Sequence, residues 1–410
     1  MTMRESCEVL IVGGGPAGAS TAVSLRHQGI DVMLVDRARF PRPKPCAEYL
    51  SPEASRILDS MGALAAVEST GAAQLAGVFV RAPNGDTIRG EFIAGHAYTP
   101  FRQRGLSVRR EVLDKLLVDS ARAAGADVHE GTRVMTLTRR PTGGFDAEIL
   151  CDGIRKRLRC RLVIGADGLH SLVANRLGLT RAARWPRRLA LVTHYEGVAD
   201  IGPLAEMHVE RDGFVGIADV GHGLTTVAMV VPARRARELA GHKEDFLEGW
   251  LRSKPQLAGR FASARRVTPI QATGPFASQA RRAWSDDALL VGDAADFFDP
   301  FTGEGIFAAL RGGELAAASA TRALRAAGGA RRQALASYEA DRRATFGGKW
   351  IVERVIAAVV ANPWLINRAA RTLSRRRDMA DLLIGVTGDF VPAREIVNAR
   401  YVLTTFGVLG

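Results

Sequence analysis

Apolar runs of strand length alternate with stretches of helical period along this chain. The clearest example is at the N-terminus, where the apolar run 9–12 ends in Gly13-Gly14-Gly15 and small residues with helical spacing follow over 19–27. A second apolar run, 32–35, then ends on Asp36. Short apolar runs without alternation are typical of buried parallel strands, so this segment predicts a β-α-β unit.

Two later apolar runs, 161–165 and 288–291, are also of the buried type, and each leads into glycine and an acid. Alternating polar and apolar positions instead predict antiparallel strands at 189–197, 206–210, 214–219 and 225–231. Asn84-Gly85 is a strong hairpin signal between two further strands, 77–81 and 87–92.

Helical periodicity predicts helices at 52–61, 107–124 and 306–323, and a helical pattern continues from residue 333. Within it, 350–360 and 364–373 have apolar faces with Arg on the other faces. We expect these C-terminal helices to dock on the main body, since most amphipathic helices bury one face. The alternatives are closure over an apolar substrate or contact with a membrane surface.

The order of these patterns predicts an α/β fold: a Rossmann-like nucleotide-binding domain with an inserted antiparallel β-sheet domain and a C-terminal helical segment. The nucleotide-binding domain is expected in three parts, 1–75, 101–185 and 270–330. The inserted substrate domain is expected at 76–100 and 186–269, and the helical segment at 331–410.

Composition narrows the classes of partner. The 410 residues are 47% hydrophobic and carry a net charge of +13, from Arg scattered along the chain. No basic stripe interleaved with aromatic residues and no nucleic-acid motif is present, so nucleic-acid binding is not expected. A solvated Arg-rich surface is the preferred interpretation, with peripheral contact to an anionic membrane as the alternative.

The four cysteines have neither a C-x-x-C nor a metal-ligand spacing, and the histidines are scattered, so no metal site is expected. Free cysteines and the lack of a signal-peptide pattern predict a cytoplasmic protein. The longest apolar stretch, 355–361, is too short to span a bilayer. No pattern predicts an oligomeric state.

Gly13, Gly15 and Gly18 have the G-x-G-x-x-G spacing of a dinucleotide site. Such glycines permit a tight turn, close approach of a diphosphate and close packing of helix on strand. The diphosphate would meet the unpaired N–H groups at the helix N-terminus, and Asp36 is placed to accept from a ribose hydroxyl. A glycine-rich turn without a ligand is the alternative, but it leaves the placement of Asp36 unexplained.

Two further strand ends point to a flavin. Asp167 and Asp293 each follow a buried strand, and ligands of open α/β sheets bind at the carboxyl ends of strands. Either acid alone could form an ordinary strand-end turn. Asp293 is the stronger candidate because residues 299–306 lead from it to a second helix N-terminus, whose dipole would stabilise a reduced flavin.

Residues 39–52 contain prolines that forbid regular structure and predict a stiff loop. Cys46 lies in this loop, in Lys44-Pro45-Cys46. A thiol on a stiff loop is a candidate reactive group, although free cysteine is often simply a small buried hydrophobe.

Taken together, these stretches resemble the flavoproteins of p-hydroxybenzoate hydroxylase fold and, within it, the geranylgeranyl reductase family, over roughly residues 5–330. The resemblance implies an FAD cofactor, with Gly13, Gly15, Ala17 and Gly18 at the diphosphate and Asp36 at the adenosine ribose. It places Arg110 against the FAD, Val134 against the adenine, Asp293 at the ribityl chain, and Gly305 and Ile306 at the flavin ring. Further cofactor contacts are predicted at Arg37, Cys46, Ala47, Asp167, Gly168, Pro300 and Gly303.

The resemblance also implies a reaction. Cys46 would lie in the active site as the catalytic residue, while NAD(P)H, for which the chain has no second glycine motif, would dock transiently to reduce the flavin. The flavin would then reduce a carbon–carbon double bond of an apolar, isoprenoid- or quinone-like substrate.

One departure from the family keeps alternatives open. The strand 213–218 lacks most of the aromatic residues that shape the reductases' lipid tunnel. A flavin monooxygenase acting on an aromatic or polyketide-like ring is therefore the alternative enzyme. A flavin-binding or basic-surface interaction protein without turnover is the alternative from another class.

Overall fold

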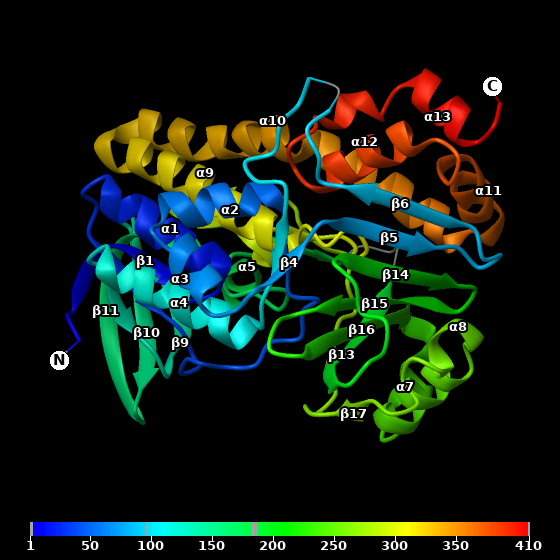
Figure 1. Ribbon diagram of the computed structural model, residues 1–410. Coiled ribbons are helices and arrows are strands. Elements are labelled where there is room, and N and C mark those ends of the chain that lie inside the picture. Colours follow the sequence, from blue (N-terminus) through cyan, green and yellow to red (C-terminus); the bar gives the residue numbers. More distant parts are fainter. Residues whose placement is uncertain (1–2, 96, 183–184, 186, 409–410) are drawn as a thin grey trace.

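The computed structural model describes residues 3–95, 97–182, 185 and 187–408. A parallel-sheet unit, with β1 and α1, lies beside an antiparallel-sheet unit, with β13 to β16 (Figure 1). The chain passes repeatedly between the two units, so the antiparallel unit is an insertion. The α/β fold with an inserted antiparallel sheet is confirmed.

β1 (Ser6–Val12) is the centre of the parallel sheet. It pairs with β2 (Val32–Val35) on one side and with β11 (Ile154–Gly165) on the other. β8 (Asp127–His129) pairs with β2, and β21 (Ala288–Leu290) pairs with β11, all in parallel. Val12 lies opposite both Val35 and Gly165. The predicted strands therefore end together along one edge of this sheet.

Helices α1 (Pro16–His27), α4 (Arg110–Ala123), α9 (Gly305–Arg325) and α10 (Gly328–Ala361) belong to this unit. α1 can pack closely against α9 because both carry small residues: a Cβ at Gly313 would come within 2.8 Å of Ser20. α10 lies along the other side of α9 (Figure 1). β9 (Thr132–Arg139) and β10 (Phe145–Cys151) form an antiparallel extension of β11, and β10 was not predicted.

The antiparallel sheet has the strand order β17-β13-β16-β15-β14-β5-β6. Its members are β5 (Gly77–Arg81), β6 (Thr87–Glu91), β13 (Arg188–Glu196), β14 (Leu204–Glu210), β15 (Gly213–Asp219), β16 (Leu224–Pro232) and β17 (Arg265–Arg266). The predicted hairpin and the four predicted alternating strands are thus present. β18 (Gln271–Thr273) also pairs with β13, although the predicted boundary at 269/270 assigns it to the other domain.

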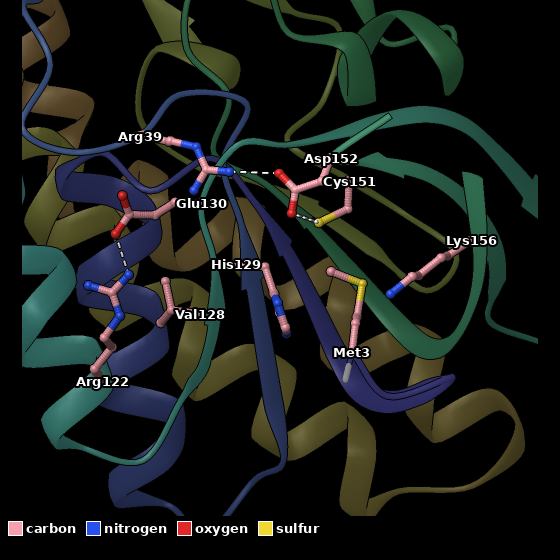
Figure 2. Close-up of a pocket in the computed structure, with 9 residues that line it drawn as sticks. All are labelled: Met3, Arg39, Arg122, Val128, His129, Glu130, Cys151, Asp152 and Lys156. Atoms are coloured by element: carbon pink, nitrogen blue, oxygen red, sulfur yellow. Dashed lines mark hydrogen bonds and ion pairs between the residues drawn. The ribbon is translucent and has the colours of Figure 1, made fainter. Parts of the chain in front are cut away.

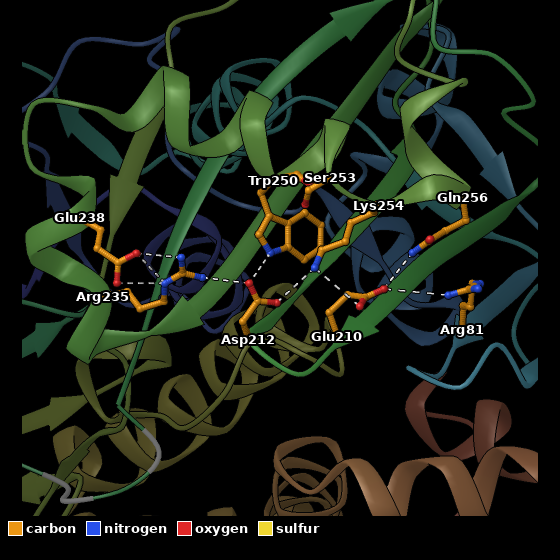
Figure 3. Close-up of polar contacts among 9 residues, drawn as sticks. All are labelled: Arg81, Glu210, Asp212, Arg235, Glu238, Trp250, Ser253, Lys254 and Gln256. Carbon is orange, nitrogen blue, oxygen red and sulfur yellow. Dashed lines mark hydrogen bonds and ion pairs between the residues drawn. The ribbon is translucent and has the colours of Figure 1, made fainter.

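Alternation along these strands produces two apolar faces. Leu191, Val215 and Met229 face the outer helices α7 (Lys243–Arg252) and α8 (Pro255–Ala258), whereas Val192 and Phe214 belong to the inner face. At the outer edge, Asp212 accepts hydrogen bonds of 3.0 Å from both Arg235 and Trp250, which fastens α7 to the β14–β15 turn (Figure 3).

The C-terminal helices α11 (Pro363–Leu373) and α12 (Arg377–Thr387) pack on β6 and the inner face, so docking on the main body is confirmed. α10 is a single helix of 34 residues, so the helical pattern predicted from residue 333 is confirmed and includes the apolar-faced stretch 350–360. It continues through Gly347-Gly348 because that helix face is close-packed: a Cβ at Gly348 would lie 2.8 Å from Ala393.

The remaining elements are short. They are α2 (Pro52–Ser60), α3 (Leu64–Ser69), α5 (Leu172–Arg176), α6 (Ala236–Leu239), α13 (Ala399–Thr405), β3 (Tyr49–Leu50), β4 (Ala73–Leu75), β7 (Gly105–Ser107), β12 (Thr180–Ala182), β19 (Ser278–Ala280), β20 (Trp284–Ser285) and β22 (Asp296–Phe297). In the part of the chain that the structure describes, no helix is both long and apolar enough to cross a bilayer.

Candidate functional site

The glycine loop between β1 and α1 is close-packed on two sides and open on the third. Gly13 has φ +108°, and a Cβ there would lie 2.3 Å from the carbonyl oxygen of Ala166. A Cβ at Gly18 would lie 1.8 Å from the carbonyl oxygen of Gly13. At Gly15, by contrast, a Cβ would meet only Arg42 at 3.8 Å and Arg110 at 4.0 Å. The open side of the loop therefore faces two guanidinium groups.

Asp36 is buried at the end of β2, and its carboxylate fixes the glycine loop. Its Oδ2 accepts a 2.7 Å hydrogen bond from the N–H of Gly14, and its Oδ1 accepts one of 2.8 Å from Ala38. This role was not predicted. Each carboxylate oxygen can accept a further hydrogen bond, so the predicted ribose contact is compatible with it.

Cations gather beside the loop. Arg110, the first residue of α4, donates two 2.9 Å hydrogen bonds to Asp114, and Arg42 lies 3.0 Å from the same carboxylate. Burial lowers the pKa of the Arg110 guanidinium, but Asp114 and Cys46 outweigh this effect and raise it. Burial lowers the pKa of Lys44, against the attraction of Asp293. Arg42, Lys44 and Arg110 therefore offer the charge that a diphosphate requires.

The third strand end, after β21, reaches the same place. A Cβ at Gly292 would lie 3.0 Å from Ala17, at the start of α1. Burial raises the pKa of the neighbouring Asp293, while Lys44 and Arg110 act in the opposite direction. The ends of β1, β11 and β21, which are far apart in the sequence, thus converge beside α1.

Asp167 and Gly168 follow β11. The Asp167 carboxylate accepts hydrogen bonds from the Ser171 hydroxyl, at 2.5 Å, and from the N–H of Leu172, at 2.6 Å. Ser171 caps α5 by accepting from the N–H of Ala174. Asp167 therefore fixes the local turn, whereas Gly168 faces the site: a Cβ there would lie 3.4 Å from the Lys44 Nζ atom.

The loop before α9 lies against Tyr49. Gly303 has φ +73°, and a Cβ there would come within 2.9 Å of the Tyr49 ring. Gly303 also donates a 3.2 Å hydrogen bond to the carbonyl of Pro300. Gly305 is the first residue of α9, whose N-terminus has no side-chain cap among the described residues. Ile306 is buried in the core of the parallel-sheet unit.

Glu304 precedes α9 and is buried. Its carboxylate lies 3.0 Å from Lys349 of α10. Burial raises the pKa of Glu304, opposed by Lys349. α10 thereby contributes charged groups to the site, which no sequence pattern indicated.

The loop with Cys46 lies between the two units. Cys46 packs against the core of the parallel-sheet unit, and Ala47 packs against the inner face of the antiparallel sheet. The N–H of Glu48 donates to the Cys46 sulfur at 3.3 Å. A residue two positions after the thiol thus contacts it directly.

Two further predicted cofactor residues lie near the ends of β2 and β9. Arg37 follows Asp36 and is exposed, and Val134 is in β9 with its side chain buried in the core, so that its backbone remains the part predicted to face the adenine. Residues at the β8–β9 turn, His129 and Glu130, line a polar pocket of about 390 Å³, which contains none of the predicted site residues (Figure 2).

A larger cavity of about 560 Å³ lies between the antiparallel sheet and the junction of α10 with α11. Phe214 is one of its lining residues and packs edge-on against Phe301, at 5.0 Å between ring centroids. Phe301 belongs to the loop before α9, so the cavity adjoins that loop. Four arginines also line it: Arg187, Arg188, Arg211 and Arg234.

The charge of this cavity is positive. Its single acidic lining residue, Glu210, accepts a 2.8 Å hydrogen bond from Gln256 and lies 3.7 Å from Lys254 (Figure 3). Arg188 donates at 2.7 Å to Asp299. Among the described residues, no carboxylate lies within ion-pair distance of the other three arginines, which remain available to an anion.

Comparison with known proteins supports a flavin site. The family described as FAD binding domain matches residues 6–349. A digeranylgeranylglycerophospholipid reductase of Methanosarcina acetivorans is 28% identical over 330 residues, which cover 78% of this chain and 77% of that protein.

Solved structures show the same fold. A flavoprotein/dehydrogenase from Cytophaga hutchinsonii has a TM-score of 0.83 at 20% identity and covers 98% of this chain and 95% of its own. The flavin-dependent halogenase CmlS has a TM-score of 0.79 at 22% identity, with 96% and 76% covered. A probable FAD-dependent monooxygenase from Pseudomonas aeruginosa has a TM-score of 0.69 at 23% identity, with 93% and 99% covered. At these identities the likeness establishes the fold alone.

Proposed function

The chain belongs to the FAD binding domain family of flavoenzymes, and on that premise we propose that it uses NAD(P)H to reduce a carbon–carbon double bond of an apolar, isoprenoid- or quinone-like substrate. Bound FAD would supply the two-electron chemistry by accepting a hydride and passing it on. The chain's own residues bind the cofactor, orient the substrate and hold the proton that completes the reduction.

The residues present fit FAD. The open cradle at Gly15, the uncapped N-terminus of α1 and the cations Arg42 and Arg110 suit a diphosphate. Asp36 would hold the adenosine ribose and Asp293 the ribityl chain. Gly305 and Ile306, at the start of α9, would lie against the flavin ring. Each of these contacts is part of the proposal.

The observation that carries the reductase assignment is the setting of Cys46. Its sulfur accepts from the Glu48 N–H and interacts with the Arg110 guanidinium, and it lies between the cofactor side and the substrate sheet. This thiol is held by a hydrogen-bond donor and lies beside a cation. Such a group can hold and release a proton at the sulfur, which reduction of a double bond requires.

The cavity of about 560 Å³ supports a particular substrate shape. Phe214 offers apolar contact next to the loop before α9, and Arg211 and Arg234 offer positive charge. We therefore propose that the substrate has an apolar body and an anionic end, such as a phosphate ester. The apolar body would extend toward Phe301 and the anionic end toward solvent.

The experiment is anaerobic reduction of the purified yellow protein with NADPH or NADH, followed by geranylgeranyl diphosphate. Mass spectrometry of the product should show two added hydrogens for each reduced bond. Cys46→Ala should keep the yellow colour and lose at least tenfold in product formation, whereas Cys151→Ala, at another half-buried cysteine, should retain activity. Equal activity of both variants would remove Cys46 from the reaction.

A second candidate function is a monooxygenase acting on an aromatic or polyketide-like ring. It is favoured by strand β15, which lacks most of the aromatic residues of the reductases. Oxygen consumption that rises with an aromatic substrate, together with an oxygenated product, would establish that reaction instead. A colourless protein that takes up no FAD would leave only a binding role without turnover.

A further inference from the structure

Glu48 has an unusual backbone for a buried residue with a side chain. Its φ is +64°, in the left-handed region, and only 3% of it is exposed. Such a conformation is strained in a residue other than glycine and persists where the surroundings impose it. The contacts of Glu48 show what imposes it here.

Both carboxylate oxygens of Glu48 are held, each by a different unit of the fold. Oε1 accepts a 2.9 Å hydrogen bond from the backbone N–H of Arg110, in the parallel-sheet unit. Oε2 lies 2.7 Å from Nε2 of His194, on β13 of the antiparallel sheet. The backbone carbonyl of Glu48 accepts from Val108 at 3.2 Å. These contacts fix the side chain and the main chain together.

His194 is fixed as well. It is buried on the inner face of the antiparallel sheet, on the same side of β13 as Val192. Its Nδ1 lies 3.0 Å from the hydroxyl of Thr268, and its own backbone N–H donates to that hydroxyl at 3.0 Å. With both ring nitrogens engaged, the imidazole has one orientation.

The consequence falls on Cys46. The backbone N–H of Glu48 donates to the Cys46 sulfur at 3.3 Å, so the thiol is held by the same turn that the Glu48 side chain anchors. Without the His194 contact, Glu48 would lose one of the two partners that fix its carboxylate. Release of this side chain would loosen the turn over residues 46–48 and weaken the hydrogen bond from the Glu48 N–H to the sulfur.

We propose that Glu48 and His194 are positioning residues that hold the Cys46 sulfur in its reactive state, so that docking of the antiparallel sheet sets the reactivity of this thiol. The pair acts through the Glu48 backbone and touches no substrate. The proposal concerns the chain's own thiol and holds whichever substrate the protein takes.

A substitution at His194 leaves the other charged groups around the Cys46 loop in place, which makes the test specific. These groups lie on α4 and on the loop before Glu48: Arg42, Lys44, Arg110 and Asp114. A shift in the behaviour of Cys46 on changing His194 must therefore pass through Glu48.

The test is alkylation of the full-length purified protein by iodoacetamide, with and without added FAD, across pH 6 to about 10. Peptide mass spectrometry measures the rate at Cys46 and, in the same sample, at Cys151 as an internal standard. For His194→Leu we expect an alkylation rate at Cys46 about tenfold lower at pH 7.5. Cys151 should be unaffected.

His208→Leu is the matched control. His208 is also buried on the antiparallel sheet and lies 2.8 Å from Glu206, but it belongs to β14 and makes no contact with the Cys46 loop among the described residues. It should leave the Cys46 rate within about twofold. If His194→Leu does not fold, the variants His194→Gln and Thr268→Val test the proposal in its place. His194→Gln keeps a donor and should restore most of the rate, while Thr268→Val should lower it. A Cys46 rate that stays unchanged, or that rises, in folded His194→Leu or Thr268→Val would overturn the proposal.

Discussion

The carboxylate of Asp36 accepts a 2.7 Å hydrogen bond from the backbone N–H of Gly14, 22 residues earlier in the chain. The acid expected to bind a ribose therefore also holds the glycine loop against β2. We predict that Asp36→Ala lowers the free energy of unfolding of the FAD-free protein by about 1–3 kcal/mol, because the buried N–H of Gly14 and the half-buried N–H of Ala38 lose a charged acceptor. Urea denaturation measures this effect, and unchanged stability would contradict it.

Substitutions at Gly13 and Gly15 should affect different properties, namely folded stability at Gly13 and FAD affinity at Gly15. Gly13→Ala places a Cβ 2.3 Å from a carbonyl oxygen at φ +108°, so it should destabilise the FAD-free protein by at least about 2 kcal/mol. Gly15→Ala meets nothing closer than 3.8 Å and should leave that stability within about 0.5 kcal/mol. It should nevertheless weaken FAD binding at least about tenfold, because its Cβ would occupy the place proposed for the diphosphate. Thermal melts measure the stability of the two variants, and flavin fluorescence titrations measure their affinity for FAD. Equal losses of stability in the two variants would contradict the assignment of Gly13 to folding and Gly15 to cofactor binding.

Asp114 is the shared counter-ion of Arg110 and Arg42, and its side chain is fully buried. Asp114→Asn should cost about 3–5 kcal/mol of stability because it leaves buried guanidinium charge without a partner. Asp119→Asn, on the exposed side of the same helix, should cost less than about 1 kcal/mol. Chemical denaturation measures both losses of stability. Similar losses for Asp114→Asn and Asp119→Asn would contradict a special role for the buried carboxylate of Asp114.

Glu353 of α10 predicts a dependence of stability on pH. Burial, and then repulsion from Glu304, raise the pKa of Glu353 from 4.5 to about 8. The folded state therefore binds this proton more tightly than the unfolded state, so the group's contribution to stability falls as pH rises from about 4.5 to 8. The full difference corresponds to about 5 kcal/mol, and partial exposure reduces the expected effect to about 2 kcal/mol.

Glu353→Gln should remove that dependence. The variant should match the unmodified protein near pH 5 and exceed its stability by about 2 kcal/mol near pH 8.5. Denaturation curves at the two pH values give the comparison. A stability difference that does not change with pH would contradict the pKa of about 8.

The arginines of the large cavity predict a difference between two substrates. The double variant Arg211→Gln/Arg234→Gln should raise the KM for geranylgeranyl diphosphate about tenfold, because two cations no longer face the anionic end. The KM for the neutral geranylgeraniol should stay within about twofold. Parallel losses for both substrates would place the anionic end elsewhere.

The sequence was sufficient for features that depend on local pattern. Gly13 and Asn84-Gly85 occupy positions that demand particular backbone geometry, and the apolar runs before Gly13, Asp167 and Asp293 became neighbouring strands of one sheet. The carboxyl ends of parallel strands lie at the same edge of their sheet, which is why the convergence of the site could be predicted from three distant stretches.

Contacts between distant side chains could not be predicted in this way. Nothing in the spacing of Glu48 and His194 indicates that they meet, because periodicity assigns residues to faces and not to partners. The capping role of Asp167 was hidden for a related reason, since an acid after a strand serves a turn or a ligand equally well.

The most direct measurement of the central claim is a titration of the flavin-free protein with FAD, followed by quenching of flavin fluorescence. The account predicts saturation at one FAD per chain, with the affinity reduced by Gly15→Ala at unchanged folded stability. A protein that leaves FAD fluorescence unaltered, or that binds FAD equally well with alanine at position 15, would contradict the assignment of the cradle beside α1 as the cofactor site.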